Sequence, residues 1–537
     1  MNKKKDTKYI FVLGGVMSGL GKGIAASSIG YLMKQAGVNV TILKLDPYLN
    51  VDPGTMNPYQ HGEVFVLDDG SETDLDLGHY ERFIDVNMTK KNNTTAGQIY
   101  SKVLERERKG EYLGETVQVI PHVTDEIKSR IISLNSNNNY DVVICEVGGT
   151  VGDIESLPFM EAIRQLSLEV GYHNHMLVHV TLLPFVKASG ELKSKPTQHS
   201  VMKLREIGLS PDMILCRSKY SIEQSVRDKI ALFCNVLPDH VIEGRDVNSI
   251  YEVPLAMHDQ RAGHLIKKRL KINKTPNLGA LRKFIQNYNN PRYEITIAMC
   301  GKYTELIDSY KSVMEAFVHA GVENNARVNV KWIQTEKVKD DISAKNIFSN
   351  IDGILILPGF GSRGAEGKIQ SSRYARENNI PFLGICLGLQ CAVIDFARNV
   401  CAMAGANSTE FNKKTKYPVI DFMESQRAIK IKGGTMRLGA YNCEIKEGTK
   451  TFSAYKEKKI TERHRHRYEV NNRFTKRLQK NGLILSGIND ELGVVEAIEI
   501  KNHPWFIASQ FHPELKSRVN KAHPLFREFI SAAIKNR

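Results

Sequence analysis

The chain has 537 residues, of which 42% are hydrophobic and 25% are charged. This length is too great for one hydrophobic core and predicts about two or three domains of ordinary globular composition. No run of about eighteen consecutive apolar residues occurs, which excludes a membrane-spanning helix. The formal net charge of +15 is spread along the chain, so it favours anionic small-molecule substrates over nucleic acid or a membrane as the partner.

Cysteine usage indicates a reducing compartment. The eight cysteines are scattered and form no CxxC pair. This spacing argues against a zinc site and against a disulfide framework. We therefore expect a cytoplasmic location.

Short apolar runs alternate with helical patterns through the first half of the chain. The runs begin at Tyr9, Val40, Tyr140, His175 and Asp212, and helical patterns cover residues 24–36 and 154–168. Strands that alternate with helices predict an α/β fold with a doubly wound parallel sheet. Ligands of such sheets bind at the carboxyl ends of the strands.

The stretch GGVMSGLGKG, residues 14–23, is close to a phosphate-binding loop and departs from it twice. The motif G-x-x-x-x-G-K-[ST] would need glycine at Val16 and a hydroxyl at Gly23. Lys22 can still reach phosphate oxygens, while backbone amides at the start of the next helix bind others. The missing hydroxyl leaves open what would hold a magnesium ion.

Two acidic residues can replace that hydroxyl, because magnesium takes hard oxygen ligands. Asp76 lies in the segment GSETDLDLGHYERF, and Glu146 ends the apolar strand VVICE. The alternative for Asp76 is a solvated acidic loop. A carboxylate at the end of an apolar strand is costly unless a cation meets it, so Glu146 is the firmer candidate.

A third segment, GELKSKPTQHSV, places Lys193, Lys195, Thr197 and Gln198 close together. Neighbouring lysines repel one another unless they bind a polyanion, such as a second triphosphate. The alternative is a solvated surface loop.

Residues 273–292 are predicted to be a linker with one short helix, between a synthetase domain of residues 1–272 and a second domain of residues 293–537. The strand–helix pattern restarts at ITIAMCGKY and continues through GILILPGFG, IPFLGICLG and WFIASQFHPE. We predict a second α/β domain with a doubly wound parallel sheet.

Cys386 lies between Gly384 and Gly388, after an apolar strand and before a helical pattern. This G-x-C-x-G arrangement is typical of a nucleophile elbow, and the helix N-terminus favours the thiolate. A buried structural cysteine is the alternative.

His512 and Glu514, in SQFHPE, can serve as base and orienting group if both side chains of an extended segment face one way. The glycine-rich LPGFG turn can offer backbone N–H groups to an oxyanion.

These motifs resemble the class I glutamine amidotransferases, which have a GxCxGxQ elbow and a late HPE. The resemblance implies that Cys386 attacks the glutamine amide, that His512 transfers protons and that Glu514 holds the imidazole. It also implies that Glu410 and Arg467 bind the two ends of glutamine, with Gly359, Leu387 and Gln390 completing that site. The alternative for the RHRHR run, residues 463–467, is a solvated basic face or a phosphate patch.

The first half resembles the CTP synthase family. The segments KLDPYLNVDPGTMNPYQHGEVFV, ETDLDLGHYERF, EVGGTVGDIES, KSKPTQHSV and GRDVNSIYEVP carry this resemblance. Together with the glutaminase half, the match runs from residue 8 to about residue 530. The resemblance implies a P-loop-like synthetase joined to a class I glutaminase. It also implies ATP-dependent amination of UTP at C4 through a 4-phosphoryl intermediate, with GTP activation and CTP feedback inhibition.

The resemblance also assigns site residues. Magnesium is expected on Asp76 and Glu146, and His61 is expected to line an ammonia gate. The remaining assignments are Ser18, Gly19, Leu20, Gly21, Lys22, Gly23, Lys44 and Asp76 for ATP; Ser18, Asp153, Ile154, Glu155, Lys193, Lys195, Gln198 and Lys229 for UTP and CTP; and Arg108, Lys109, Leu113 and Gly114 for a GTP lid. The family further implies a homotetramer with UTP sites at subunit interfaces, and leaves filament formation open.

Two rival functions differ in what they need. A different ATP-dependent amidotransferase, such as a cobyrinate amidase, would also have a deviant phosphate loop but would lack KSKPTQHSV. A catalytically silent filament or scaffold protein would not need Cys386, His512 and Glu514 together with Lys22 and Asp76.

Overall fold

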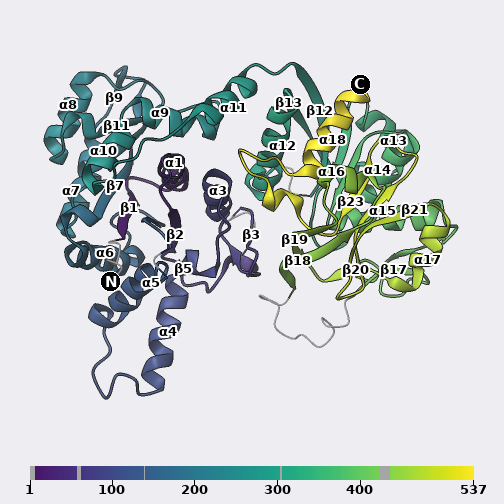
Figure 1. Cartoon of the computed structure of the whole chain (residues 1–537), viewed down its shortest axis with the longest axis horizontal. Coiled ribbons are helices and arrows are strands. Elements are labelled where there is room, and N and C mark those ends of the chain that lie inside the picture. The colour runs from purple at the N-terminus through teal and green to yellow at the C-terminus, as the bar shows by residue number, and fades with distance from the viewer. Residues whose placement is uncertain (1–6, 57–61, 138, 303–304, 423–435) are drawn as a thin grey trace. The chain divides into compact units, whose positions relative to one another are not determined.

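The computed structural model describes residues 7–56, 62–137, 139–302, 305–422 and 436–537. The chain forms two compact units, of which the first contains Met1–Asp52 and Asp76–Ile285 and the second contains Pro53–Leu75 and Gln286–Arg537 (Figure 1). The chain thus passes from the first unit to the second within α11, Gly279–Asn289. The segment Pro53–Leu75 groups with the second unit, although it follows the second strand of the chain.

The first unit is built on a seven-stranded sheet in the order β11-β10-β7-β1-β6-β2-β5, and all its strand pairs are parallel. The apolar runs expected to be strands are strands of this sheet. Its members are β1 Lys8–Gly14, β2 Val40–Asp46, β5 Asn93–Thr95, β6 Val142–Val147, β7 His175–Leu182, β10 Met213–Ser218 and β11 Val241–Arg245.

Helices cover both faces of this sheet. Phe11 and Cys145 pack on one face with apolar side chains of α4, α5 and α6. On the other face α1 approaches so closely that a Cβ at Gly30 would lie 3.3 Å from Ile42. The helices of the unit are α1 Lys22–Gln35, α3 Leu75–Ile84, α4 Ala96–Arg108, α5 Thr124–Ser133, α6 Leu157–Val170, α7 Lys195–Glu206, α8 Gln224–Cys234, α9 Val253–Asp259 and α10 Ala262–Leu270; a small ribbon joins β8 Phe185–Val186 to β9 Glu191–Leu192.

The second unit contains a nine-stranded sheet in the order β13-β12-β14-β15-β23-β22-β21-β18-β19. The expectation of a purely parallel sheet is wrong for half of it. The pairs from β13 to β23 are parallel, whereas β23, β22, β21, β18 and β19 pair antiparallel. The reason is that β21 to β23 follow one another through short connections with no crossover helix between them, and antiparallel strands need none.

The strands of this sheet are β12 Tyr293–Gly301, β13 Ala326–Gln334, β14 Gly353–Ile356, β15 Phe382–Ile385, β18 Arg437–Ile445, β19 Lys459–His466, β21 Leu483–Asn489, β22 Val494–Ile500 and β23 Phe506–Ser509. A separate three-stranded sheet contains β16 Asn407–Ser408, β17 Pro418–Phe422 and β20 Tyr468–Val470.

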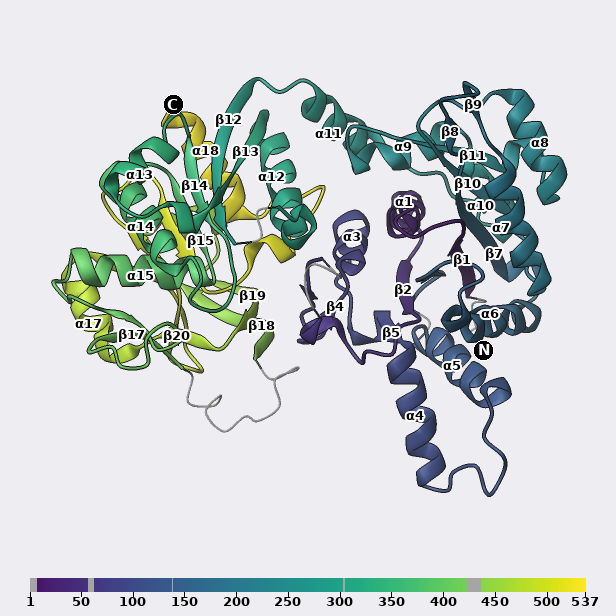
Figure 2. The same ribbon diagram turned by 180° about the vertical axis from the view of Figure 1, so that it is seen from behind.

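Helices also cover both faces of the second sheet (Figure 2). Apolar residues of α13, α14 and α15 share one core with Ile354 and Phe506, and those of α12, α16 and α18 share another core with Leu355 and Ile507. The helices are α12 Lys311–Glu323, α13 Asp341–Ile347, α14 Ala365–Glu377, α15 Leu387–Asn399, α16 Lys450–Tyr455, α17 Asn472–Lys480 and α18 Pro524–Lys535.

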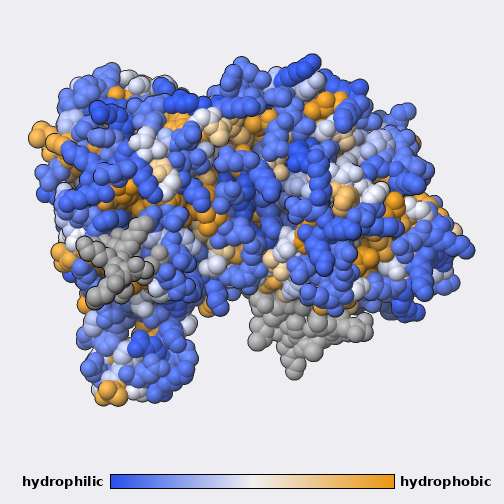
Figure 3. Space-filling model, in the orientation of Figure 1, coloured by the Kyte–Doolittle hydropathy of each residue, from blue (hydrophilic) through white to orange (hydrophobic). Residues whose placement is uncertain are grey.

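The surface agrees with the composition of the sequence. The face drawn in Figure 3 is mostly hydrophilic, and its hydrophobic residues are scattered in small groups. Within the described ranges, no helix combines the length and the apolar character needed to cross a bilayer. All eight cysteines are free and buried.

Candidate active sites

Cys386 occupies a sharp turn between β15 and α15. Its backbone has φ 54° and ψ −100°, a strained conformation for a residue with a side chain. Its N–H donates to the Ser509 carbonyl of the neighbouring strand β23, at 2.7 Å. A Cβ at Gly384 would lie 2.8 Å from the Gly388 backbone, and a Cβ at Gly388 would lie 2.7 Å from the Ile356 carbonyl oxygen, so the turn requires both glycines. The predicted nucleophile elbow is therefore present in the geometry.

His512 is oriented by Glu514 through a bond of 2.7 Å between Nδ1 and Oε1. Burial lowers the pKa of His512, but Glu514 and Cys386 outweigh burial and raise it to about 10. Among the described residues, His512 Nε2 has no hydrogen-bond partner and is available to exchange a proton with Cys386. Glu514 lies in a 3₁₀ turn, Pro513–Lys516, so the expectation that it continues an extended strand is wrong.

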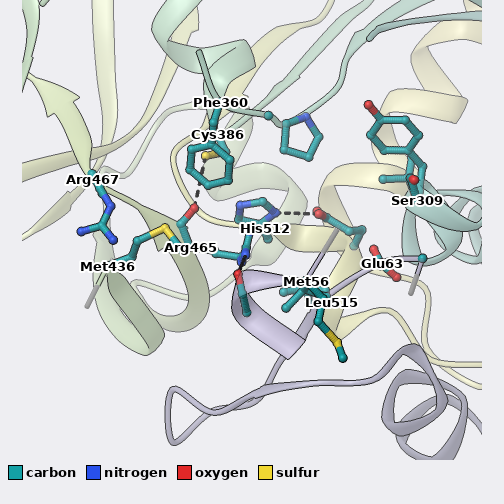
Figure 4. A pocket seen from close by; sticks show the side chains of 18 of the residues that line it. Met56, Glu63, Ser309, Phe360, Cys386, Met436, Arg465, Arg467, His512 and Leu515 are labelled. Atoms are coloured by element: carbon teal, nitrogen blue, oxygen red, sulfur yellow. Dashed lines mark hydrogen bonds and ion pairs between the residues drawn. The ribbon is translucent and has the colours of Figure 1, made fainter. Parts of the chain in front are cut away.

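Cys386, His512 and Glu514 line one cavity of about 580 Å³ within the second unit. Figure 4 shows Cys386 and His512 facing this cavity, with Phe360, Arg465 and Arg467 around it. The lining also includes Gly54, Met56, Gly62, Glu63 and Val64 from the segment Pro53–Leu75. A wall of the cavity is therefore supplied by residues far away in the sequence.

Three of the five predicted glutamine-binding residues line the same cavity, and Leu387 and Gln390 do not. Gly359, Glu410 and Arg467 line it. Glu410 accepts from the Gly361 N–H at 2.6 Å, and burial raises the pKa of its carboxyl although that N–H opposes the shift. Gln390 donates to the Tyr468 carbonyl at 3.0 Å from the buried first turns of α15, which Leu387 begins.

The RHRHR run is not a solvated basic face. Arg463 is 0% exposed, and its guanidinium bonds Asp68 of the segment Pro53–Leu75. Arg465 donates to Glu72 of the same segment at 2.8 Å, and its guanidinium lies over the Phe360 ring. Asp68 and Glu72 are thus paired with these arginines rather than solvated.

Left-handed backbone conformations recur in the loop before α1, where the sequence predicts phosphate binding. Val16, Gly19 and Gly21 have φ of 77°, 75° and 81°, so Val16 takes the left-handed conformation normally left to glycine. Helix α1 begins at Lys22 with no side-chain cap, which leaves the N–H groups of its first turn to a ligand. Ser18 and Leu20 lie in the loop before α1, and Gly23 is the second residue of that helix.

The surroundings of Gly23 show which side chain lies where the missing hydroxyl would be. A Cβ at Gly23 would lie 2.1 Å from Oδ1 of Asp76, at the start of α3. The carboxylate of Asp76 therefore occupies the space beside the first turn of α1 in which the Ser or Thr side chain of a standard phosphate loop would lie. Glycine at position 23 is a requirement of this approach.

The two predicted magnesium ligands converge on one lysine. Lys44 Nζ bonds Asp76 and lies 3.0 Å from Glu146 Oε1. Burial raises the pKa of the Glu146 carboxyl, whereas Lys44 outweighs burial at Asp76 and lowers its pKa. Lys22 donates to the Gly149 carbonyl at 2.7 Å, and burial lowers its pKa.

This donor set fits a magnesium ion that arrives with a nucleotide. Magnesium binds through one or two carboxylates, with phosphates and waters completing its octahedron. No cluster of three or more His, Cys, Asp or Glu side chains in the described ranges is placed to hold a metal ion alone. Asp76 and Glu146 therefore fit a shared ion rather than an all-protein site.

The residues predicted for the second nucleotide lie in three places. Asp153, Ile154 and Glu155 follow the β6 loop, and Ile154 is 82% exposed. Lys193 and Lys195 flank the start of α7, where Gln198 is buried and donates to Ser194 Oγ at 3.0 Å. Lys229, exposed on α8, lies near enough to Glu191 to lower the pKa of its carboxyl, an effect smaller than that of Lys193.

The predicted lid is an exposed turn beyond α4 (Figures 1 and 2). Leu113 is 93% exposed, with φ 52°, and Gly114 has φ 87°. Arg108 pairs with Glu107, and Lys109 pairs with Glu105 at 2.5 Å. His61, predicted to line an ammonia gate, lies outside the described residues.

Sequence reasoning missed Asp46, Tyr80 and Arg465. Asp46 Oδ1 lies 3.8 Å from Lys44 Nζ, and Tyr80 donates to Glu146. Asp46 ends the buried strand β2, so the signal that identified Glu146 could have found it. Tyr80 and Arg465 depend on tertiary contacts that no local pattern announces.

Each half of the chain matches a known protein family. Residues 8–272 match the family described as CTP synthase N-terminus, and residues 305–532 match the class I glutamine amidotransferases. The CTP synthases of Caldanaerobacter subterraneus subsp. tengcongensis and Clostridium acetobutylicum are each 56% identical to the chain over 528 residues, covering 98% of this chain and 98% of theirs. The solved glutaminase domain of Trypanosoma brucei CTPS with bound acivicin is 37% identical, covers 45% of this chain and 94% of its own, and has a TM-score of 0.42.

Identity of this extent over nearly the whole chain rules out a cobyrinate amidase. The chain belongs to the CTP synthase family of glutamine-dependent ligases.

Proposed function

We propose that the two units divide the synthesis of CTP between them, with the residues described above in named roles. The second unit releases ammonia from glutamine, and the first unit uses ATP to activate C4 of UTP for attack by that ammonia. The observation that carries this proposal is the pair of dissimilar centres: a Cys386–His512–Glu514 triad in one unit, and a phosphate loop with Lys44, Asp76 and Glu146 in the other.

In the second unit, Cys386 Sγ forms a bond to the amide carbon of glutamine. His512 holds the thiol proton and delivers it to the nitrogen as the C–N bond breaks, so ammonia leaves and a thioester remains. Water then hydrolyses the thioester to glutamate. Glu514 keeps the imidazole in place, and the N–H groups of Gly359 and Leu387 are our candidates for the oxyanion donors.

In the first unit, the C4 oxygen of UTP must become a leaving group before ammonia can displace it. Transfer of the γ-phosphoryl group of ATP to that oxygen gives a 4-phosphoryl intermediate, from which ammonia displaces phosphate. Lys22 and the uncapped first turn of α1 bind phosphate oxygens, and Lys44 lies beside them. A magnesium ion held by Asp76 and Glu146 would neutralise charge on the phosphates.

Nucleotide recognition and regulation are proposed for the exposed segments. The triphosphate of UTP or of the inhibitor CTP binds to Lys193, Lys195, Gln198 and Lys229. Glu155 recognises the pyrimidine ring. The lid residues Arg108, Lys109, Leu113 and Gly114 respond to the activator GTP.

We propose a homotetramer, because Ile154 and Lys195 are exposed in the single chain and a neighbouring subunit could complete their site. Eight free thiols suit the cytoplasm.

The role of the two carboxylates is tested by Asp76→Asn and Glu146→Gln. Both variants should lose CTP formation with glutamine and with ammonium chloride alike, because each removes a charge that phosphoryl transfer needs. Asp69→Asn, at an exposed position of the same acidic stretch, is the matched control and should keep the parental rate. Full activity of Asp76→Asn or Glu146→Gln at ordinary magnesium would refute the assignment.

A further inference from the structure

Lys368 is a buried lysine in α14 that the mechanism above does not use. Its side chain is 0% exposed, and its Nζ donates to the Leu357 carbonyl at 2.8 Å. Within the described ranges, no ion pair joins it to a carboxylate. A buried ammonium without a carboxylate partner is costly, so packing alone does not explain why lysine occupies this position.

The ammonium lies directly behind the predicted oxyanion loop. Leu357 precedes Pro358 and Gly359, and a Cβ at Gly359 would lie 3.7 Å from Lys368 Nζ and 3.8 Å from a methyl carbon of Leu387. The charge therefore adjoins Gly359, whose N–H is one of the two candidates for binding the glutamine carbonyl oxygen. A fixed positive charge in a dry site interacts strongly with negative charge that develops during a reaction.

The other groups that face Lys368 offer it little compensation. Burial lowers the pKa of Lys368 to about 8, and the nearby positive charge of Lys302 adds to this shift. The thiols of Cys391, Cys300 and Cys386 oppose it. Burial also raises the pKa of Cys300 and of Cys391 to about 12, so these two thiols stay neutral. Glu410, whose carboxyl pKa Lys368 helps to lower, is its acidic neighbour at rest, and the further negative charge that Lys368 can meet is the charge formed during turnover at Cys386.

We propose that Lys368 is a positioning and electrostatic residue of the glutaminase reaction. It fixes the strand end that carries the oxyanion loop, and its positive charge stabilises the oxyanion of the tetrahedral intermediates. Sulfur attack on the amide carbon moves the carbonyl electron pair onto oxygen, and collapse of the intermediate returns that pair as the C–N bond breaks. Lys368 neither gains nor loses a proton in this step.

The test compares Lys368→Gln, Lys368→Met and Lys368→Arg in the full-length chain. Lys368→Gln is the deciding variant because it keeps an N–H donor for Leu357 and removes the charge. We expect its glutaminase kcat to fall by about ten-fold to a hundred-fold while the KM for glutamine stays within about two-fold, because the charge acts on the transition state. Lys368→Met should behave similarly, and Lys368→Arg should recover part of kcat.

Two further readouts separate charge from structure. Ammonia-dependent CTP formation should be unchanged in Lys368→Gln. The parental glutaminase kcat should decline as pH rises through about 8, because the ammonium then loses its proton, and this decline should be absent in Lys368→Gln. His512, Glu410 and Lys302 are retained in every variant, but loss of the Lys368 charge should raise the pKa of Glu410, so the profiles are compared only above about pH 7.

A parental kcat in Lys368→Gln, or a raised KM with kcat unchanged, would overturn the proposal. So would parallel loss of ammonia-dependent activity, which would indicate a structural role. If Lys368→Gln loses its near-ultraviolet circular dichroism, the parental pH profile decides: no decline in kcat from about pH 7 to about pH 9 would contradict the proposal. The inference rests on Cys386 as the nucleophile, which Cys386→Ala tests independently.

Discussion

At the scale of single residues, Gly23 decides where a carboxylate can lie. Alanine is the better helix former by about 1 kcal/mol, so Gly23→Ala would stabilise α1 if propensity alone mattered. A Cβ at that position would lie 2.1 Å from Asp76 Oδ1 and must displace the carboxylate. We expect Gly23→Ala to lose about a hundred-fold in CTP formation with glutamine and with ammonia alike.

The control for this prediction is Gly263→Ala in α10, where a Cβ would meet only Leu32, at 3.9 Å. Steady-state assays of both variants with each nitrogen source provide the measurement. Parental activity in Gly23→Ala would mean that the approach of Asp76 to α1 is not needed.

The chemistry-bearing residues were predictable where a local pattern exposes them. Cys386 stands on a strand–turn–helix with flanking glycines, and Glu146 is a carboxylate one residue before the end of the buried strand β6, so each could be read from its neighbours. Arg465 could not, because its role depends on pairing with Glu72, nearly four hundred residues earlier. Lys368 carries no motif, and only its burial reveals it.

At the scale of elements, the strands and helices of both sheets follow from hydrophobic runs and glycine turns. The antiparallel half of the second sheet does not, because an apolar run has the same appearance in either direction. The grouping of Pro53–Leu75 with the second unit was also beyond prediction. An acidic stretch and a basic run are complementary in charge, but sequence alone does not show that they meet.

Glu63 of this segment caps helix α12. Its carboxylate accepts from the N–H of Ser312 at 2.9 Å and from the hydroxyl of the same residue at 2.6 Å. Removal of a helix cap costs about 1 kcal/mol, so Glu63→Ala should speed amide hydrogen exchange in the first turn of α12 by about five-fold. Exchange followed by mass spectrometry on the full-length chain measures this.

Glu447→Ala is the matched control for the cap, because Glu447 pairs with Lys458 at 2.9 Å on the surface. It should leave exchange in α12 unchanged. Equal protection of α12 in Glu63→Ala and in the parental chain would show that the segment does not stabilise the helix.

At the scale of the whole molecule, one chain carries two centres whose chemistry differs in kind. In the function proposed above, one centre uses a thiol and an imidazole whose pKa is raised to about 10, and the other uses lysines and carboxylates around a phosphate loop. The glutamine reaction needs a nucleophile that the protein supplies. In the UTP reaction the nucleophile is ammonia itself, and the protein has to support phosphoryl transfer. The two activities should therefore separate on mutation.

The most direct measurement is CTP formation by Cys386→Ala, assayed spectrophotometrically with glutamine and with ammonium chloride. Only the glutamine route requires the thiol. We predict that the variant makes no CTP from glutamine and retains the parental rate from ammonia. Loss of both routes, or continued synthesis from glutamine, would contradict the division of labour between the two units.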